Sequence, residues 1–114
     1  VIIRVVPVMD DGVLDRTAFE KMLGPKTRLV GVTHISNALG TINPVEAIIA
    51  MARSQAPDAK ILIDGSQGIV HAAVNVLAMG PDFYVWTGHK LYGPTGIGVL
   101  WGRPDLLQSM PPWQ

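Results

Sequence analysis

The sequence predicts an α/β fold: a three-layer sandwich with a mostly parallel sheet and one antiparallel strand. Apolar runs of strand length alternate along the chain with amphipathic runs of helical period, which is the pattern of a parallel sheet with helices on both faces. The last apolar run follows its predecessor through a loop without a helical pattern, so we expect that last strand to be antiparallel. A length of 114 residues fits one domain.

The first two elements are a strand and a helix. Residues 1–8 are rich in β-branched side chains and predict a strand. Asp15 has the position of a helix N-cap. We expect this helix to end near Leu23, because Gly24-Pro25 is a stop signal.

A second strand and helix follow. Residues 27–35 are nearly continuous in apolar side chains, as expected of a strand buried on both faces. Asn43 then predicts an N-cap with Pro44 at the first helical position, and Pro57 ends the helix. The apolar residues of this helix recur at i, i+3, i+4 and i+7, namely at Val45, Ile48, Ile49 and Ala52.

The remaining elements are short. Three further strands are expected at residues 60–63, 82–87 and 97–101. Helices are expected near Ser66, over residues 75–79 with Gly80 closing them, and from residue 103 onward.

Polar residues follow three of these strands directly. In open parallel sheets, ligands bind outside the carboxyl ends of the strands, so side chains stranded there converge on one edge. The residues concerned are Asn37 after the second strand, Asp64 and Gln67 after the third, and Thr87, His89 and Lys90 after the fourth. This convergence predicts a functional site at that edge.

Of these residues, Lys90 has the side chain best suited to covalent chemistry. It follows an apolar strand and opens a loop that is rich in glycine and shaped by Pro94. A lysine held at the mouth of a sheet can be desolvated and act as a nucleophile. Taken alone it is more often a solvated surface lysine, and its neighbours favour the functional interpretation.

The neighbouring residues suit pyridoxal phosphate. A carboxylate at Asp64 could hold a protonated ring nitrogen, Gln67 could donate to a phenolic oxygen, and Thr87 with His89 could donate to a phosphate. The plain alternatives are a helix cap for Asp64, a surface amide for Gln67 and a partly buried, hydrogen-bonded ring for His89. We interpret the other two histidines, His34 and His71, as structural.

Composition narrows the class of protein. The net charge is +0, so no electrostatic attraction to nucleic acid or to an acidic membrane is expected. No metal-ligand pattern is visible, and there are no cysteines for a disulfide framework or thiol chemistry. The longest purely apolar run, residues 47–52, is far shorter than the roughly 20 residues of a membrane span. We therefore expect a cytoplasmic location.

Three stretches resemble a known family. They are THISNALGTINPV (33–45), ILIDGSQ (61–67) and TGHKLYGPTGIGVLWG (87–102). The sequence resembles the group II, Suf-type cysteine desulfurases and selenocysteine lyases of the aminotransferase class V family. The resemblance implies the central part of a fold type I large domain, with both ends truncated, and a homodimer with pyridoxal 5'-phosphate near the subunit interface.

The resemblance also implies a role for each residue at the predicted edge. Lys90 would be the Schiff-base lysine, and Asp64 the partner of the pyridine nitrogen. Gln67 would meet the phenolic oxygen of the cofactor, and Thr87 and His89 its phosphate. Asn37 would contact the carboxylate of a small amino-acid substrate.

The implied reaction removes sulfur from L-cysteine, or selenium from L-selenocysteine, and leaves L-alanine. The sulfur would pass as a persulfide to an acceptor protein for iron–sulfur cluster assembly. The isolated 114 residues are expected to be inactive. Two alternatives stay open: another class V enzyme, such as an aminotransferase or epimerase, and a non-catalytic fragment.

Overall fold

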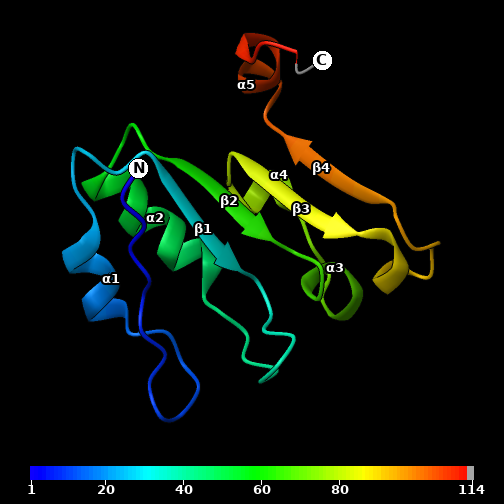
Figure 1. Ribbon diagram of the computed structural model, residues 1–114, viewed down its shortest axis with the longest axis horizontal. Helices are drawn as coiled ribbons and strands as arrows, with labels where there is room; N and C mark the ends of the chain where they lie inside the picture. Colours follow the sequence, from blue (N-terminus) through cyan, green and yellow to red (C-terminus); the bar gives the residue numbers. More distant parts are fainter. Residues whose placement is uncertain (113–114) are drawn as a thin grey trace.

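The computed structural model describes residues 1–112, which form one four-stranded sheet with short helices around it (Figure 1). The strands are β1 (Leu29–Thr33), β2 (Lys60–Asp64), β3 (Phe83–Thr87) and β4 (Gly98–Gly102). The helices are α1 (Arg16–Met22), α2 (Val45–Gln55), α3 (Gly68–His71), α4 (Val76–Met79), the 3₁₀ helix η1 (Gly88–Leu91) and α5 (Pro104–Ser109).

The strands lie in the order β1-β2-β3-β4, and the first three are parallel. The fourth strand is antiparallel to β3, with Thr87 opposite Gly98. The predicted mixed sheet is therefore confirmed. In the parallel part, Thr33, Asp64 and Val85 are in register across the three strands, so the chain segments that follow these strands leave from the same edge of the sheet.

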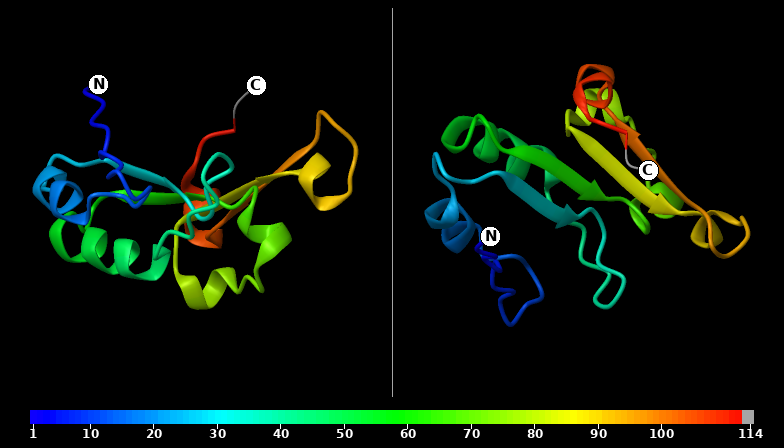
Figure 2. Two further views of the ribbon diagram at one scale, coloured as in Figure 1. Left: turned by 90° about the horizontal axis from the view of Figure 1, so that it is seen from below. Right: turned by 45° about the horizontal axis from the view of Figure 1, so that its top comes forward.

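The helices that connect the parallel strands lie on one face of the sheet. The left view of Figure 2 shows α2, α3 and α4 on the same side. This follows from the strand order: each connection steps to the next strand in the same direction, and connections of one hand then share one face. The expected second layer of helices is not formed by residues 1–112.

The first predicted strand is wrong. Residues 1–8 form only an isolated antiparallel bridge between Val8 and Leu14, and Val1, Ile2 and Ile3 are almost fully exposed. A run of β-branched residues becomes a strand only where a partner backbone accepts its hydrogen bonds. No strand of the described sheet pairs with this segment.

Two of the three predicted caps are confirmed. The Asp15 carboxylate accepts a hydrogen bond from the Ala18 N–H at 2.9 Å at the start of α1, and Gly80 closes α4 with a φ of 80°. The cap at Asn43 is wrong, because its buried side chain donates to the Thr33 carbonyl at 2.8 Å instead. Pro44 takes the cap position, and α2 begins one residue later than predicted.

The core lies between α2 and the covered face of the sheet. The predicted apolar stripe of α2 is confirmed, since Val45, Ile48, Ile49 and Ala52 are all buried. They belong to one cluster with buried side chains of the three parallel strands, which are Val30, Ile61, Ile63 and Tyr84. Within residues 1–112 no helix has the length and apolar character that a membrane crossing requires.

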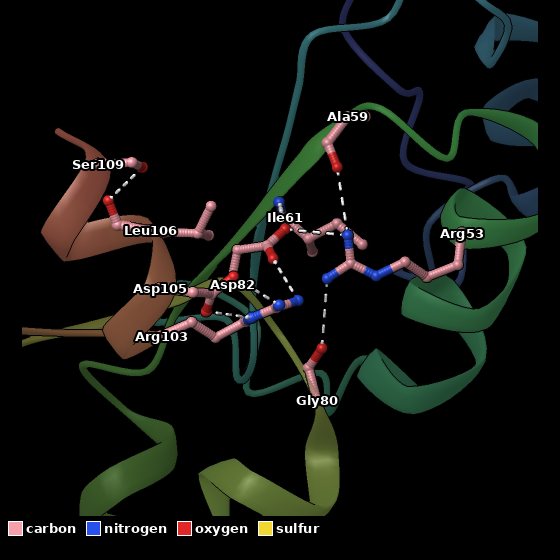
Figure 3. A network of polar contacts seen from close by, with 9 residues as sticks. All are labelled: Arg53, Ala59, Ile61, Gly80, Asp82, Arg103, Asp105, Leu106 and Ser109. Atoms are coloured by element: carbon pink, nitrogen blue, oxygen red, sulfur yellow. Dashed lines mark hydrogen bonds and ion pairs between the residues drawn. The ribbon is translucent and has the colours of Figure 1, made fainter.

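At the amino ends of the parallel strands, a buried carboxylate connects the sheet to the neighbouring helices (Figure 3). Asp82, at 1% exposure, precedes β3, and its Oδ2 accepts a hydrogen bond from the Ile61 N–H at 2.8 Å. The same oxygen lies 3.0 Å from a guanidinium nitrogen of Arg53 on α2, and Oδ1 lies 3.4 Å from Arg103 after β4. Asp82 thus connects α2, β2, β3 and the start of α5.

Removal of this carboxylate should destabilise the fold. Asp82→Ala leaves the Ile61 N–H without its side-chain acceptor and two guanidinium groups without their shared anion. Breaking a buried ion pair costs roughly 3–5 kcal/mol, and we expect about 3 kcal/mol because both arginines still reach solvent. Urea unfolding of the full-length protein that contains this chain measures the change.

Asp105→Ala is the matched control. Asp105 also pairs with Arg103, at 2.8 Å, but its side chain is 59% exposed. Exposed ion pairs are screened by solvent and contribute little to stability, so we expect a much smaller loss of unfolding free energy than for Asp82→Ala. Equal losses of unfolding free energy in the two variants would show that the burial of Asp82 is energetically unimportant.

Candidate functional site

Three of the predicted residues meet at the carboxyl edge of the parallel strands. The side-chain oxygen of Asn37 accepts a hydrogen bond from Lys90 Nζ at 3.0 Å and another from Gln67 Nε2. Asn37 follows β1, Gln67 follows β2 and Lys90 follows β3. The structure therefore brings together the polar groups of three strands that are distant in sequence, as the pattern predicted.

The loop that carries Lys90 is shaped by its backbone. The Gly88 N–H donates to the Ile97 carbonyl at 2.8 Å, and the Gly93 N–H donates to the Gly88 carbonyl at 2.9 Å. A Cβ on Gly93 would lie 3.0 Å from that carbonyl oxygen, so the close return of the chain favours glycine there. Tyr92 has a φ of 59° in the left-handed region, and its side chain is almost fully exposed. The result is a tight turn that presents Lys90.

Thr87 and His89 form a second polar group next to Lys90. Thr87 Oγ1 and His89 Nδ1 are 2.7 Å apart and share a hydrogen bond. They lie on either side of Gly88, where β3 passes into η1. A hydroxyl and an imidazole side by side at a strand end can both donate to an anion.

Asp64 ends β2 and is exposed. Its Oδ1 accepts a hydrogen bond from the Ser66 N–H at 2.9 Å, so the carboxylate stabilises the turn that leads into α3. Among residues 1–112 it makes no direct hydrogen bond to Lys90, Asn37 or Gln67. The turn function agrees with the plain alternative for this residue, and it leaves the second carboxylate oxygen available.

The loop of Asn37 is held at its base. Ile35 and Ile42 form an antiparallel bridge, and the Ser36 N–H donates to the Thr41 carbonyl at 2.9 Å. The Thr41 hydroxyl donates to the carbonyl of Gly12 at 2.9 Å, which links this loop to the turn before α1. Asn37 is therefore displayed on a short closed loop.

The sequence reasoning missed the buried pair formed by His34 and Tyr84. His34 Nδ1 and the Tyr84 hydroxyl are 3.1 Å apart, and the two rings meet edge to face. His34 was interpreted as structural, and its burial and this bond support that interpretation. The available signal was the pair of glycines, Gly65 and Gly68, around the turn that packs on the two rings.

Comparison with known proteins identifies the family. The sequence profile described as aminotransferase class-V matches residues 1–114. The chain is 54% identical over 112 residues to a cysteine desulfurase of Dickeya dadantii, and the match covers 98% of this chain and 27% of that protein. The chain thus spans about a quarter of the length of this relative.

Solved structures agree with the sequence match. The structure of the cysteine desulfurase CsdA from Escherichia coli has a TM-score of 0.87 and 36% identity, with 96% of this chain and 27% of that chain covered. A structure described as SspA in complex with cysteine has a TM-score of 0.78 and 31% identity, with 90% and 28% covered. The chain belongs to the aminotransferase class V family, whose members depend on pyridoxal phosphate.

Proposed function

We propose that the full-length protein containing this chain is a pyridoxal-phosphate-dependent cysteine desulfurase or selenocysteine lyase. The observation that carries the proposal is the meeting of Lys90, Asn37 and Gln67 at the carboxyl edge of the sheet. It occurs in a chain that is 54% identical to a cysteine desulfurase. A lysine amine would be the attachment point of the cofactor, and a neighbouring amide would hold an amino-acid substrate.

The residues at this edge fit the cofactor by their chemistry. Lys90 offers an amine for the aldehyde, and Asp64 keeps one carboxylate oxygen for a protonated ring nitrogen. Gln67 offers an amide for the phenolic oxygen. Thr87 and His89 offer adjacent donors for a phosphate. The set therefore includes a partner for each polar group of pyridoxal phosphate.

Each of these residues has a separate role in the proposed mechanism. Pyridoxal phosphate, when bound, supplies an aldehyde that joins amines and a ring that accepts electron density from the substrate. Asp64 would hold the proton of the ring nitrogen, which keeps the ring electron-poor. Asn37 would donate its amide N–H to the substrate carboxylate and so orient the amino acid. The Lys90 amine, which donates to Asn37 Oδ1 in the protein without cofactor, would hold the cofactor aldehyde and would be able to move a proton whenever the amine is free.

In the proposed reaction the sulfur is transferred to a thiol. The carbon–sulfur bond of cysteine breaks, a thiolate bonds to the departing sulfur as a persulfide, and the carbon takes a proton to give alanine. This balance consumes one thiol for each alanine. The described chain contains no cysteine, so the thiol must come from another part of the full-length protein or from a partner.

Partner and compartment belong to the same proposal. A persulfide needs a reductant or an acceptor protein, and iron–sulfur cluster assembly is the use we propose for it. The cytoplasm, which is kept reducing, suits such a thiol reaction. A homodimer is supported by apolar side chains exposed beside the candidate site at Leu91, Tyr92, Ile97 and Leu100.

The attachment point can be mapped directly. Borohydride reduction of the full-length holoenzyme, followed by peptide mapping, should place a pyridoxyl adduct on Lys90. Lys90→Ala should abolish the adduct. The matched control is Lys60→Ala, because Lys60 is an exposed lysine at the start of β2, away from the candidate site. An adduct on Lys60 or Lys26 in the wild-type protein would overturn the assignment.

The reaction type is tested by its co-substrate. A desulfurase should make alanine and protein-bound persulfide from cysteine alone, with a reductant to discharge the persulfide. An aminotransferase would need a keto acid to take the amine, and it would show ping-pong kinetics. Alanine is measured with and without added pyruvate. Alanine that forms only with the keto acid would replace the desulfurase proposal with an aminotransferase.

A further inference from the structure

A buried polar pair lies beneath the turn that joins Asp64 to Gln67. Tyr84 on β3 is fully buried at 0% exposure, and His34, which follows β1, is 8% exposed. The Tyr84 hydroxyl and His34 Nδ1 are 3.1 Å apart. A buried phenol and a buried imidazole each need such a partner, because an unpaired polar group inside a protein is costly.

The turn packs directly on this pair. A Cβ added to Gly65 would lie 2.0 Å from two ring carbons of Tyr84, and one added to Gly68 would lie 2.3 Å from His34 Nδ1. These distances are shorter than any real contact, so the backbone of the turn rests on the two rings. The position of the rings therefore sets the position of the turn.

Backbone hydrogen bonds fix the turn to both neighbouring strands. The His34 N–H donates to the Asp64 carbonyl at 2.7 Å, and the Gly65 N–H donates to the Val85 carbonyl at 2.8 Å. His34 and Tyr84 thus come from the two elements that flank the turn. Displacement of either ring would move the turn relative to Lys90, which belongs to η1, the element directly after β3.

The protonation states suit a hydrogen bond from the phenol to the imidazole. Burial, together with the nearby charge of Asp64, raises the pKa of Tyr84 to about 12, so its O–H stays in place as a donor. Burial lowers the pKa of His34, and the charge of Glu46 opposes this effect. A neutral imidazole has one ring nitrogen free to accept, and in the tautomer protonated at Nε2 that nitrogen is Nδ1, 3.1 Å from the phenol oxygen.

We propose that His34 and Tyr84 are positioning residues. Their hydrogen bond fixes the position of the turn relative to the sheet. The turn in this way places the Asp64 carboxylate and the Gln67 amide relative to Lys90. The inference rests on the proposed function for its consequence, since Asp64 and Gln67 are assigned to the cofactor. Neither ring touches the reacting atoms in this scheme. They act only through the turn above them.

Three substitutions in the full-length protein test the inference. Tyr84→Phe removes only the hydroxyl. His34→Asn keeps a hydrogen-bonding atom at the position of Nδ1, whereas His34→Leu removes it at a similar size. Ile61→Val is the matched core control, because Ile61 is fully buried on β2 at the opposite end from the turn.

The first measurement uses the protein without cofactor. Hydrogen exchange over residues 64–70 should become faster in Tyr84→Phe and in His34→Leu, and less so in His34→Asn. Exchange in this segment should stay at the wild-type rate in Ile61→Val. Equal exchange in His34→Asn and His34→Leu would show that the rings merely fill space and would overturn the inference, as would unchanged exchange in both. If Tyr84→Phe does not fold, the two His34 variants decide the question.

The second measurement uses the holoenzyme. Misplacement of a catalytic group by about 1 Å can cost up to roughly 10²-fold in rate, and we expect kcat for Tyr84→Phe to fall about 10-fold with KM little changed. The absorption band of the bound cofactor should shift in the same direction as in an Asp64→Asn variant measured alongside it. Wild-type kcat and an unshifted band would overturn the inference. Failure of the wild-type protein to bind pyridoxal phosphate would instead overturn the proposed function and leave the exchange result to stand alone.

Discussion

The buried carboxylate of Asp82 is the contact on which the arrangement of the sheet depends. It binds the Ile61 N–H of β2 and two guanidinium groups, from α2 and from the start of α5. These partners meet where β3 begins, so the strands are aligned at that end. Because parallel strands held in register at one end remain in register at the other, the polar side chains at the carboxyl edge inherit their alignment. The buried ion pairs of Asp82 and the candidate site thus lie at opposite ends of the same strands.

The carboxyl edge is built from short turns, and each turn is held by backbone hydrogen bonds or by packing on buried rings. The Asn37 loop is closed by the Ile35–Ile42 bridge, and the Lys90 loop by hydrogen bonds of Gly88 and Gly93. The turn after Asp64 rests on aromatic rings instead, which is why it needs glycine at two positions. Asn37 and Asp64 are exposed and Gln67 and Lys90 are half-buried, while the backbone of each turn is fixed. Because these backbones are already ordered, the protein loses less conformational entropy when a ligand binds.

Much of this edge could be predicted from sequence because it follows from topology. Asn37, Gln67 and Lys90 meet because each follows a parallel strand, and strand ends are visible as apolar runs that stop. The strand at residues 1–8 failed because β-branched composition does not reveal whether a partner backbone is present. Asn43 was misread since a cap and a buried amide that bonds a neighbouring strand have the same local sequence. The bond between His34 and Tyr84 has no periodic signal at all, because it joins residues fifty positions apart.

The sequential strand order also bears on how the chain folds. Every strand pairs with the one that precedes or follows it in the sequence, so most of the pairing is between neighbours along the chain. The parallel pairings join Leu29 to Lys60 and Leu62 to Phe83, whereas the β3–β4 turn joins Thr87 to Gly98, so the parallel pairs lose more loop-closure entropy before they form. During synthesis β1, α2 and β2 can assemble before β4 has left the ribosome. The Lys90 loop, which is closed by the antiparallel pairing of β3 with β4, can take its shape only after β4 has been synthesised.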